Sequence, residues 1–191
     1  MLVKNWKKEI WSIPNLLSLF RILLIPVYMS IYLNAEGPED YTAAGLILAV
    51  GCLTDLADGQ IARRFNMITN LGKVLDPMAD KLTQLSLLIC LSARRRALKY
   101  LLVMFLIKEF WQLFAMVSAL RRGKALNGAL MSGKISTTVL FTSLGLMFVF
   151  PGLSERAGNI ITLVCFVFLM YAFADYVHAY FGKEKKIYDL E

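Results

Sequence analysis

The chain has 191 residues, of which 58% are hydrophobic and 18% are charged, and its formal net charge is +7. Soluble domains are usually less apolar and more highly charged, so this composition argues against an ordinary soluble domain and predicts a one-domain integral membrane protein over residues 1–191. The positive charge does not indicate nucleic acid, because the basic residues cluster at the ends of apolar segments, where they fit anionic lipid headgroups.

The first twelve residues precede the apolar segments. Val3, Trp6, Ile10 and Trp11 gather roughly on one helical face, with lysines elsewhere, so residues 1–12 predict a short amphipathic helix in the membrane interface. Six apolar segments follow, each near the ~20 residues needed to cross the hydrocarbon core. Because lipid cannot satisfy a strand edge, we expect an all-α fold with six transmembrane helices. The expected helices cover 14–34, 41–64, 73–93, 97–121, 133–152 and 157–181.

The distribution of lysine and arginine predicts the orientation of these helices. An inside amino terminus places most basic residues on the cytoplasmic side and the acidic loop at 34–40 outside. The cluster Arg94, Arg95, Arg96 with Lys99 breaks this rule, because six spans place it outside. The sequence gives no account of the cluster beyond possible headgroup binding. We expect a multi-pass cell-membrane protein with both termini inside.

Four aspartates occupy a stretch between apolar spans, where charged side chains are costly and usually mark an ion, proton or substrate site. The first two are three residues apart and the last two are four apart, so each pair shares one face of its helix. The two helices should be antiparallel with a short loop, so both pairs can converge near the cytoplasmic surface. These residues are Asp55, Asp58, Asp76 and Asp80.

Two glycines, Gly59 and Gly72, accompany the acids, and a missing side chain lets a ligand or another backbone approach closely. Four carboxylates at such range repel one another unless cations intervene, and the hard ions Mg²⁺ or Mn²⁺ suit oxygen ligands. Two such ions could clamp a pyrophosphate and stabilise in-line displacement at phosphorus. The alternatives are a structural ion-pair network with Arg63, Lys73 and Lys81, or the path of a small cation or proton transporter.

Residues 55–80 match the pattern Asp-x2-Asp-Gly-x2-Ala-Arg-x8-Gly-x3-Asp-x3-Asp, and in this motif the chain resembles the CDP-alcohol phosphatidyltransferase family. The six-span plan and the chain length are similar too. Every fixed position is filled, by Asp55, Asp58, Gly59, Ala62, Arg63, Gly72, Asp76 and Asp80.

The resemblance implies a metal-dependent transferase of phospholipid biosynthesis that takes CDP-diacylglycerol as donor. Two divalent cations would be held by the four aspartates, and Asp80 would also act as general base on the acceptor hydroxyl, with CMP as the leaving group. On the donor side, Gly59, Ala62 and Gly72 would make room for the nucleotide, while Arg63 would neutralise phosphate charge. The family also implies a homodimer.

The acceptor is less well specified. The string from Ile13 to Pro26 and residues 72–81 look like the bacterial phosphatidylglycerophosphate synthase branch, which uses glycerol 3-phosphate, but cardiolipin synthases, which use phosphatidylglycerol, share much of both. Phosphatidylglycerophosphate synthases typically carry Arg-Glu at the fourth span and Lys-x-Lys-Thr at the fifth. This chain has Lys108-Glu109, which loses the bidentate fork of arginine, and Ser136 in place of the second lysine.

Three basic residues are candidates for the acceptor side: Arg21 in the first span, Lys134 in the fifth and Arg121 at the end of the fourth. An anionic acceptor would be attracted to them. Simple snorkelling of long cationic side chains explains the first two equally well, and the basic end of a cytoplasmic span explains the third.

Overall fold

The computed structural model describes residues 11–64, 69, 71–121, 124–126, 130–181 and 187–189. The chain divides into two compact units, Met1–Cys90 and Leu91–Glu191. Six helices and one pair of short strands make up the described part. The interfacial helix predicted for residues 1–12 falls almost entirely outside the described residues.

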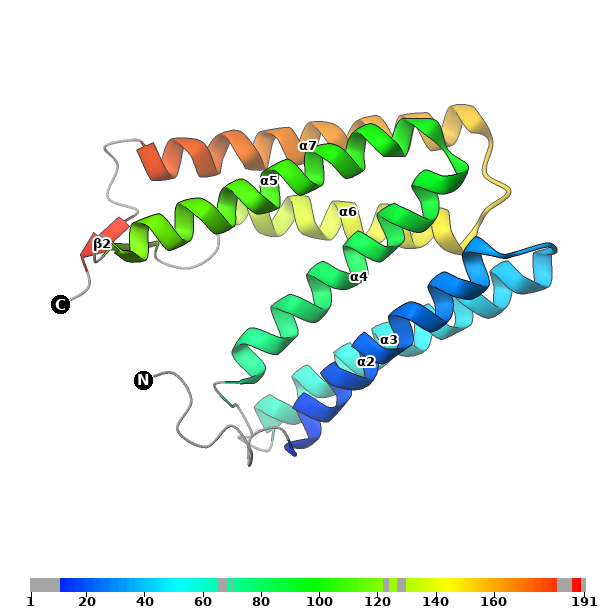
Figure 1. Cartoon of the computed structure of the whole chain (residues 1–191), viewed down its shortest axis with the longest axis horizontal. Coiled ribbons are helices and arrows are strands. Elements are labelled where there is room, and N and C mark those ends of the chain that lie inside the picture. The colour runs from blue at the N-terminus through cyan, green and yellow to red at the C-terminus, as the bar shows by residue number, and fades with distance from the viewer. Residues whose placement is uncertain are drawn as a thin grey trace. The chain divides into compact units, whose positions relative to one another are not determined.

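The first unit is built on the antiparallel helices α2 (Ile13–Leu33) and α3 (Pro38–Arg64), which lie side by side (Figure 1). Pro14 stands in the first turn of α2, where its fixed φ suits the helix and its missing N–H is no loss. Asn34 ends the helix by donating its Nδ2 to the Ser30 carbonyl at 2.9 Å. The Asp40 carboxylate then accepts the backbone N–H of Glu36 at 2.9 Å, which holds the turn into α3.

Gly51 on α3 lies beside the aliphatic stem of Arg21 on α2. Gly51 is buried, and a Cβ at this position would lie 3.6 Å from Cγ of Arg21 and 3.9 Å from a methyl carbon of Leu24, which are ordinary van der Waals distances. The stem of Arg21 thus packs against α3, and its guanidinium reaches Asp55 and Asp58 on the same helix.

Helix α4 (Gly72–Arg94) begins in the first unit and ends in the second. The hydroxyls of Tyr28 on α2 and Ser86 on α4 hydrogen-bond to each other, both in buried positions. Leu87 and Leu88 on α4 are fully buried nearby in sequence. Because buried polar groups require partners, the tyrosine–serine bond joins α2 to α4 at a defined height.

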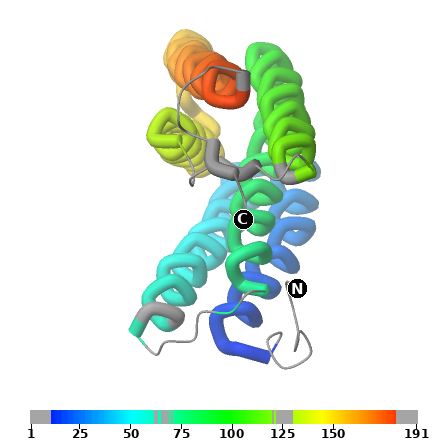
Figure 2. The backbone as a smooth tube through the Cα atoms, turned by 90° about the vertical axis from the view of Figure 1, so that its left-hand side faces the viewer, coloured from blue at the N-terminus to red at the C-terminus, as the bar shows by residue number. Residues whose placement is uncertain are grey.

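The second unit contains α5 (Arg96–Arg121), α6 (Met131–Val149) and α7 (Glu155–Phe181). Figure 2 shows α6 and α7 nearly end-on and α5 more obliquely, as separate tubes. Trp111 on α5 packs edge-on against Phe173 and Tyr180 of α7, with ring centroids 5.4 and 5.8 Å apart. Such edge-to-face pairs add to the stabilisation from burial.

Arg95, in the basic cluster that the sequence left unexplained, holds the loop between α6 and α7. Its Nη2 donates to the Leu153 carbonyl at 2.5 Å, and its Nη1 lies 3.4 Å from the Ser154 carbonyl. Gly158, in the first turns of α7, makes room for it, because a Cβ there would overlap the guanidinium. At least one member of the cluster is thus a structural cation within the second unit.

The predicted helices are confirmed, with ends that differ by at most three residues, at 38 against 41 and at 149 against 152. Among the described residues, five helices are long and apolar enough to cross a membrane, namely α2, α3, α5, α6 and α7. Helix α4 has the length but carries charged residues in its first turns, so its crossing stays a prediction from the sequence. The chain is an all-α integral membrane protein.

One element was not predicted. Strand β1 (Lys124–Leu126) pairs antiparallel with β2 (Ile187–Asp189), with Lys124 opposite Asp189. Gly133, at the start of the helix expected for 133–152, is buried within α6.

Candidate active site

The site begins with a polar stripe on α2. Asn15, Ser18 and Arg21 follow one another at intervals of three residues, so they lie along one side of the helix. Their exposed fractions are 1%, 0% and 5% in an otherwise apolar span. Three buried polar residues inside such a helix must find partners. Their partners lie on α3, on α4 and in the segment between them.

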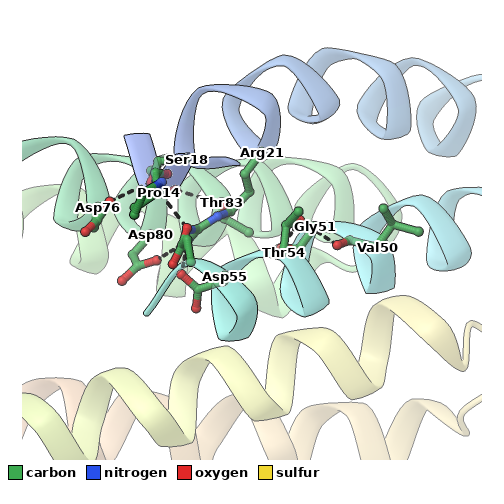
Figure 3. Close-up of polar contacts among 12 residues, drawn as sticks. Pro14, Ser18, Arg21, Val50, Gly51, Thr54, Asp55, Asp76, Asp80 and Thr83 are labelled. Carbon is green, nitrogen blue, oxygen red and sulfur yellow. Dashed lines mark hydrogen bonds and ion pairs between the residues drawn. The ribbon is translucent and has the colours of Figure 1, made fainter. Parts of the chain in front are cut away.

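Arg21 joins the two pairs of aspartates. Its Nη1 lies 2.5 Å from Asp55 Oδ1 and 2.7 Å from Asp80 Oδ1, and its Nη2 lies 2.9 Å from Asp58 Oδ2. The planar fork of a guanidinium suits such multiple contacts with carboxylates. Figure 3 shows Arg21 reaching from α2 toward the acids. The predicted convergence of the two pairs is confirmed, with a guanidinium between them.

Ser18 links the same acids from the other side of the stripe. Its hydroxyl lies 2.6 Å from Asp76 Oδ1, 3.3 Å from Asp58 Oδ2 and 3.1 Å from the Pro14 carbonyl (Figure 3). A hydroxyl has one proton, so it donates to one of these acceptors at a time. The short distance favours Asp76. Together, Arg21 and Ser18 contact all four members of the aspartate cluster, meaning Asp55, Asp58, Asp76 and Asp80.

The four acids differ in exposure. The Asp58 side chain is 5% exposed, whereas those of Asp55 and Asp80 are 43% and 50% exposed. Asp58 is therefore the buried member of the cluster, whereas Asp55 and Asp80 are accessible to a ligand.

Gly72, at the start of α4, closes a junction with α2. Asn15 Nδ2 donates to Thr69 Oγ1 at 3.0 Å, and the Gly72 N–H donates to the same oxygen at 2.9 Å. A Cβ on Gly72 would lie 2.7 Å from Asn15 Oδ1 and 3.0 Å from Thr69 Oγ1. Only glycine fits here without displacing the junction.

Gly59, the other glycine of the motif, faces open space. No atom lies within 4 Å of the position that its Cβ would occupy, outside the neighbours in its own helix. The expected close approach of another part of the chain thus applies to Gly72, while the space beside Gly59 is available to a ligand.

We expect Gly72→Ala to destabilise the protein and Gly59→Ala to leave its stability unchanged or slightly higher. The first change overpacks a buried junction, which typically costs about 1–3 kcal/mol, whereas alanine at an open helical position gains helix propensity. Thermal unfolding of both variants in the same detergent measures the difference. Equal melting temperatures would contradict the junction described for Gly72.

The donor set of the cluster fits a hard divalent cation. Carboxylates from two helices converge on one position, and a guanidinium already offsets part of their charge there. Oxygen ligands of this type suit Mg²⁺ or Mn²⁺. In the described part of the chain, no three histidine, cysteine, aspartate or glutamate side chains form a group arranged to enclose an ion directly. The acids meet through Arg21 and Ser18 instead.

The remaining predicted site residues are Ala62, Arg63, Lys134 and Arg121. Ala62 and Arg63 lie in α3, but their side chains are outside the described part. Lys134 on α6 and Arg121 at the end of α5 are both exposed and belong to the second unit. Their predicted roles toward the donor and the acceptor stay predictions.

The second unit has its own buried polar cluster. Lys108 is 4% exposed and its Nζ lies 2.7 Å from Glu109 Oε1. The same ammonium lies 5.7 Å from the centroid of the Tyr176 ring. Ser132 Oγ on α6 donates to Asp175 Oδ2 on α7 at 2.5 Å.

Three residues of the site were not predicted: Ser18, Asn15 and Thr69. The signal for the first two was present as polar residues three apart in an apolar span, in line with Arg21. Thr69 had no such signal, because a threonine in a short loop is ordinary and only the fold brings it to Asn15.

Comparisons with known proteins agree with this geometry. A cardiolipin synthase (CMP-forming) of Streptomyces coelicolor is 39% identical over 116 residues, which are 60% of this chain and 54% of that protein. A CDP-diacylglycerol–glycerol-3-phosphate 3-phosphatidyltransferase of Bacillus subtilis is 34% identical over 52% of this chain and 58% of its own length. A probable phosphatidylglycerophosphate synthase of Mycobacterium tuberculosis is 32% identical over 76% of this chain and 69% of its own.

The match thus spans little more than half the length of the first two relatives. The family model for CDP-alcohol phosphatidyltransferase covers residues 11–177, which include α2 through most of α7 and the whole aspartate cluster. This family is generally dependent on divalent cations. The motif in residues 55–80, the convergence of its acids and the family match agree, and the chain belongs to the CDP-alcohol phosphatidyltransferase family.

Proposed function

We propose that this protein transfers the phosphatidyl group of CDP-diacylglycerol to glycerol 3-phosphate, giving phosphatidylglycerophosphate and CMP. The observation that carries the proposal is the convergence of Asp55, Asp58 and Asp80 on one position between helices of the first unit. Asp76 joins them through Ser18. Family membership supplies the reaction class, and it argues against a cation or proton transporter.

In this proposal the four aspartates would hold two Mg²⁺ or Mn²⁺ ions, which supply positive charge to the pyrophosphate of the donor. The space beside Gly59 accommodates the nucleotide, with Ala62 and Gly72 in the same motif. Arg63 would neutralise phosphate charge. The donor thus enters from the membrane and presents its phosphorus beside Asp80.

Asp80 is the proposed general base. Its half-exposed side chain can reach an acceptor that arrives from solution, whereas the buried Asp58 cannot. Asp80 takes the proton of the acceptor hydroxyl, the oxygen forms a bond to the phosphorus that bears diacylglycerol, and the bond from that phosphorus to CMP breaks. General-base assistance of this kind contributes about 10²–10⁴-fold.

A second candidate uses phosphatidylglycerol as acceptor and makes cardiolipin. The similarity to the Streptomyces coelicolor protein favours this second candidate. So does Ser136, a buried neutral residue on α6 at a position where phosphatidylglycerophosphate synthases typically have a lysine. Neither observation outweighs the similarity to the Bacillus subtilis and Mycobacterium tuberculosis proteins.

The test is CMP release by the purified protein with CDP-diacylglycerol and Mg²⁺, with each acceptor offered separately. Release with glycerol 3-phosphate alone supports the proposal, and release with phosphatidylglycerol alone replaces it with the second candidate. If neither acceptor causes CMP release, both candidate functions are wrong and the acceptor is another alcohol.

The proposal includes a cell-membrane location, an active site at the cytoplasmic face and a homodimer. The positive-inside distribution of lysine and arginine supports the orientation, and the bacterial relatives support the membrane. The dimer is carried over from the family resemblance.

On the acceptor side we propose Arg21, Lys134 and Arg121. We expect Lys134→Ala to raise the KM for glycerol 3-phosphate by roughly tenfold and to leave the KM for CDP-diacylglycerol nearly unchanged, because an exposed ammonium attracts a phosphate dianion. Steady-state kinetics measures both constants. Lys99→Ala, another exposed lysine of the second unit, is the matched control. An effect confined to the donor would place Lys134 on the other side of the site.

A further inference from the structure

Arg21 occupies the position that links three acids from two helices, α3 and α4. Its two terminal nitrogens contact Asp55, Asp58 and Asp80 at 2.5–2.9 Å, and its side chain is only 6% exposed. Asp76 is linked to this group through Ser18, and a single guanidinium carries less positive charge than the three carboxylates that it contacts carry negative charge. Such a cluster needs a cation to stay together in a site partly removed from water.

The guanidinium is not fully satisfied in this position. Its Nε is buried and has no hydrogen-bond partner among the described residues. An unpaired buried donor costs free energy. The Arg21 side chain can therefore move to another conformation without giving up a complete set of hydrogen bonds.

A divalent cation would compete with Arg21 for these carboxylate oxygens. A magnesium ion needs oxygens at about 2.0–2.1 Å, and its double positive charge repels a guanidinium held on the same carboxylates. We propose that Arg21 is a built-in counter-cation, which holds Asp55, Asp58 and Asp80 together in the metal-free protein and is displaced when a divalent cation binds. The displaced guanidinium is then available to an anionic phosphate. This inference rests on the proposed function only in taking the cluster as the metal site.

The test is a titration of Mn²⁺ without donor or acceptor, in which free Mn²⁺ is followed by electron paramagnetic resonance. We expect full-length Arg21→Gln to bind Mn²⁺ at least about tenfold more tightly than the wild type, because a competing cation is gone. Arg21→Lys should fall between the two, since an ammonium keeps the charge but cannot bridge three carboxylates. Arg156→Gln, an exposed arginine of the second unit, should match the wild type.

Thermal unfolding is the second measurement, and it tests the inference even if Arg21→Gln folds poorly. In EDTA, Arg21→Gln should unfold at a lower temperature than the wild type, and Mn²⁺ should recover more stability in the variant. Mn²⁺ binding that is equal or weaker in Arg21→Gln, or absent from every variant, would overturn the inference. Because no substrate is present, failure of CMP release by the wild type would overturn the proposed function and leave this result standing.

Discussion

Asp80→Asn is expected to lower CMP release by about 10²–10⁴-fold while CDP-diacylglycerol still binds. The amide keeps an oxygen that can accept the Arg21 N–H now placed 2.7 Å from Oδ1, so the surroundings should survive. It cannot accept the proton of the acceptor hydroxyl. Initial rates with saturating donor and acceptor measure the loss, and binding of labelled donor measures what remains.

Glu39→Gln is the matched control for this variant. Glu39 is an exposed carboxylate at the far end of α3 from the motif, so its loss should leave turnover unchanged. Wild-type turnover by Asp80→Asn would remove Asp80 as the base. Loss of donor binding together with turnover would instead make Asp80 chiefly a residue of the donor site.

Asp58→Asn is expected to weaken binding of Mn²⁺ and of CDP-diacylglycerol together. Asp58 is the buried acid of the cluster, and it accepts from Arg21 Nη2 at 2.9 Å and lies 3.3 Å from the Ser18 hydroxyl. Removing its charge takes away a ligand that water cannot easily replace. Even partners of metal ligands change metal affinity by roughly 10–100-fold when mutated, so a ligand should change it at least as much.

The measurement is a pair of titrations on the same protein, Mn²⁺ alone and donor in the presence of Mn²⁺, with Glu39→Gln again as control. Both affinities should fall in Asp58→Asn. An unchanged Mn²⁺ titration would exclude Asp58 as a ligand and leave it a structural partner of Arg21.

The helices of this protein could be read from the sequence because the bilayer imposes a simple requirement. A segment of about 20 apolar residues in a bilayer has to hydrogen-bond its own backbone N–H and C=O groups, so it forms a helix. The first and last residues of the apolar segment then indicate where the helix begins and ends. The β1–β2 pair escaped prediction because three-residue strands have no comparable signal, and their pairing joins residues far apart in the chain. The close contact of Gly133 with Tyr176 on α7 could not be predicted for a related reason, because local composition does not reveal a neighbour from another helix.

The aspartate cluster could also be predicted from the sequence, since spacing along a helix determines which residues share a face. What the spacing could not show is which cation meets the acids. Arg21, which lies on a different helix from all four acids, contacts three of them. Chain distance is a poor guide to charge pairing in a helical bundle, because each helix meets residues tens of positions away.

The sequence by itself determined the family, the all-α membrane fold and the four acids, because these depend on composition and on spacing within single helices. Only the tertiary structure decided that Arg21 and Ser18 bind the acids, that Gly72 rather than Gly59 is packed against the chain, and that Arg95 holds a loop. Those facts depend on which helices face each other, and packing between helices is a property of the whole fold.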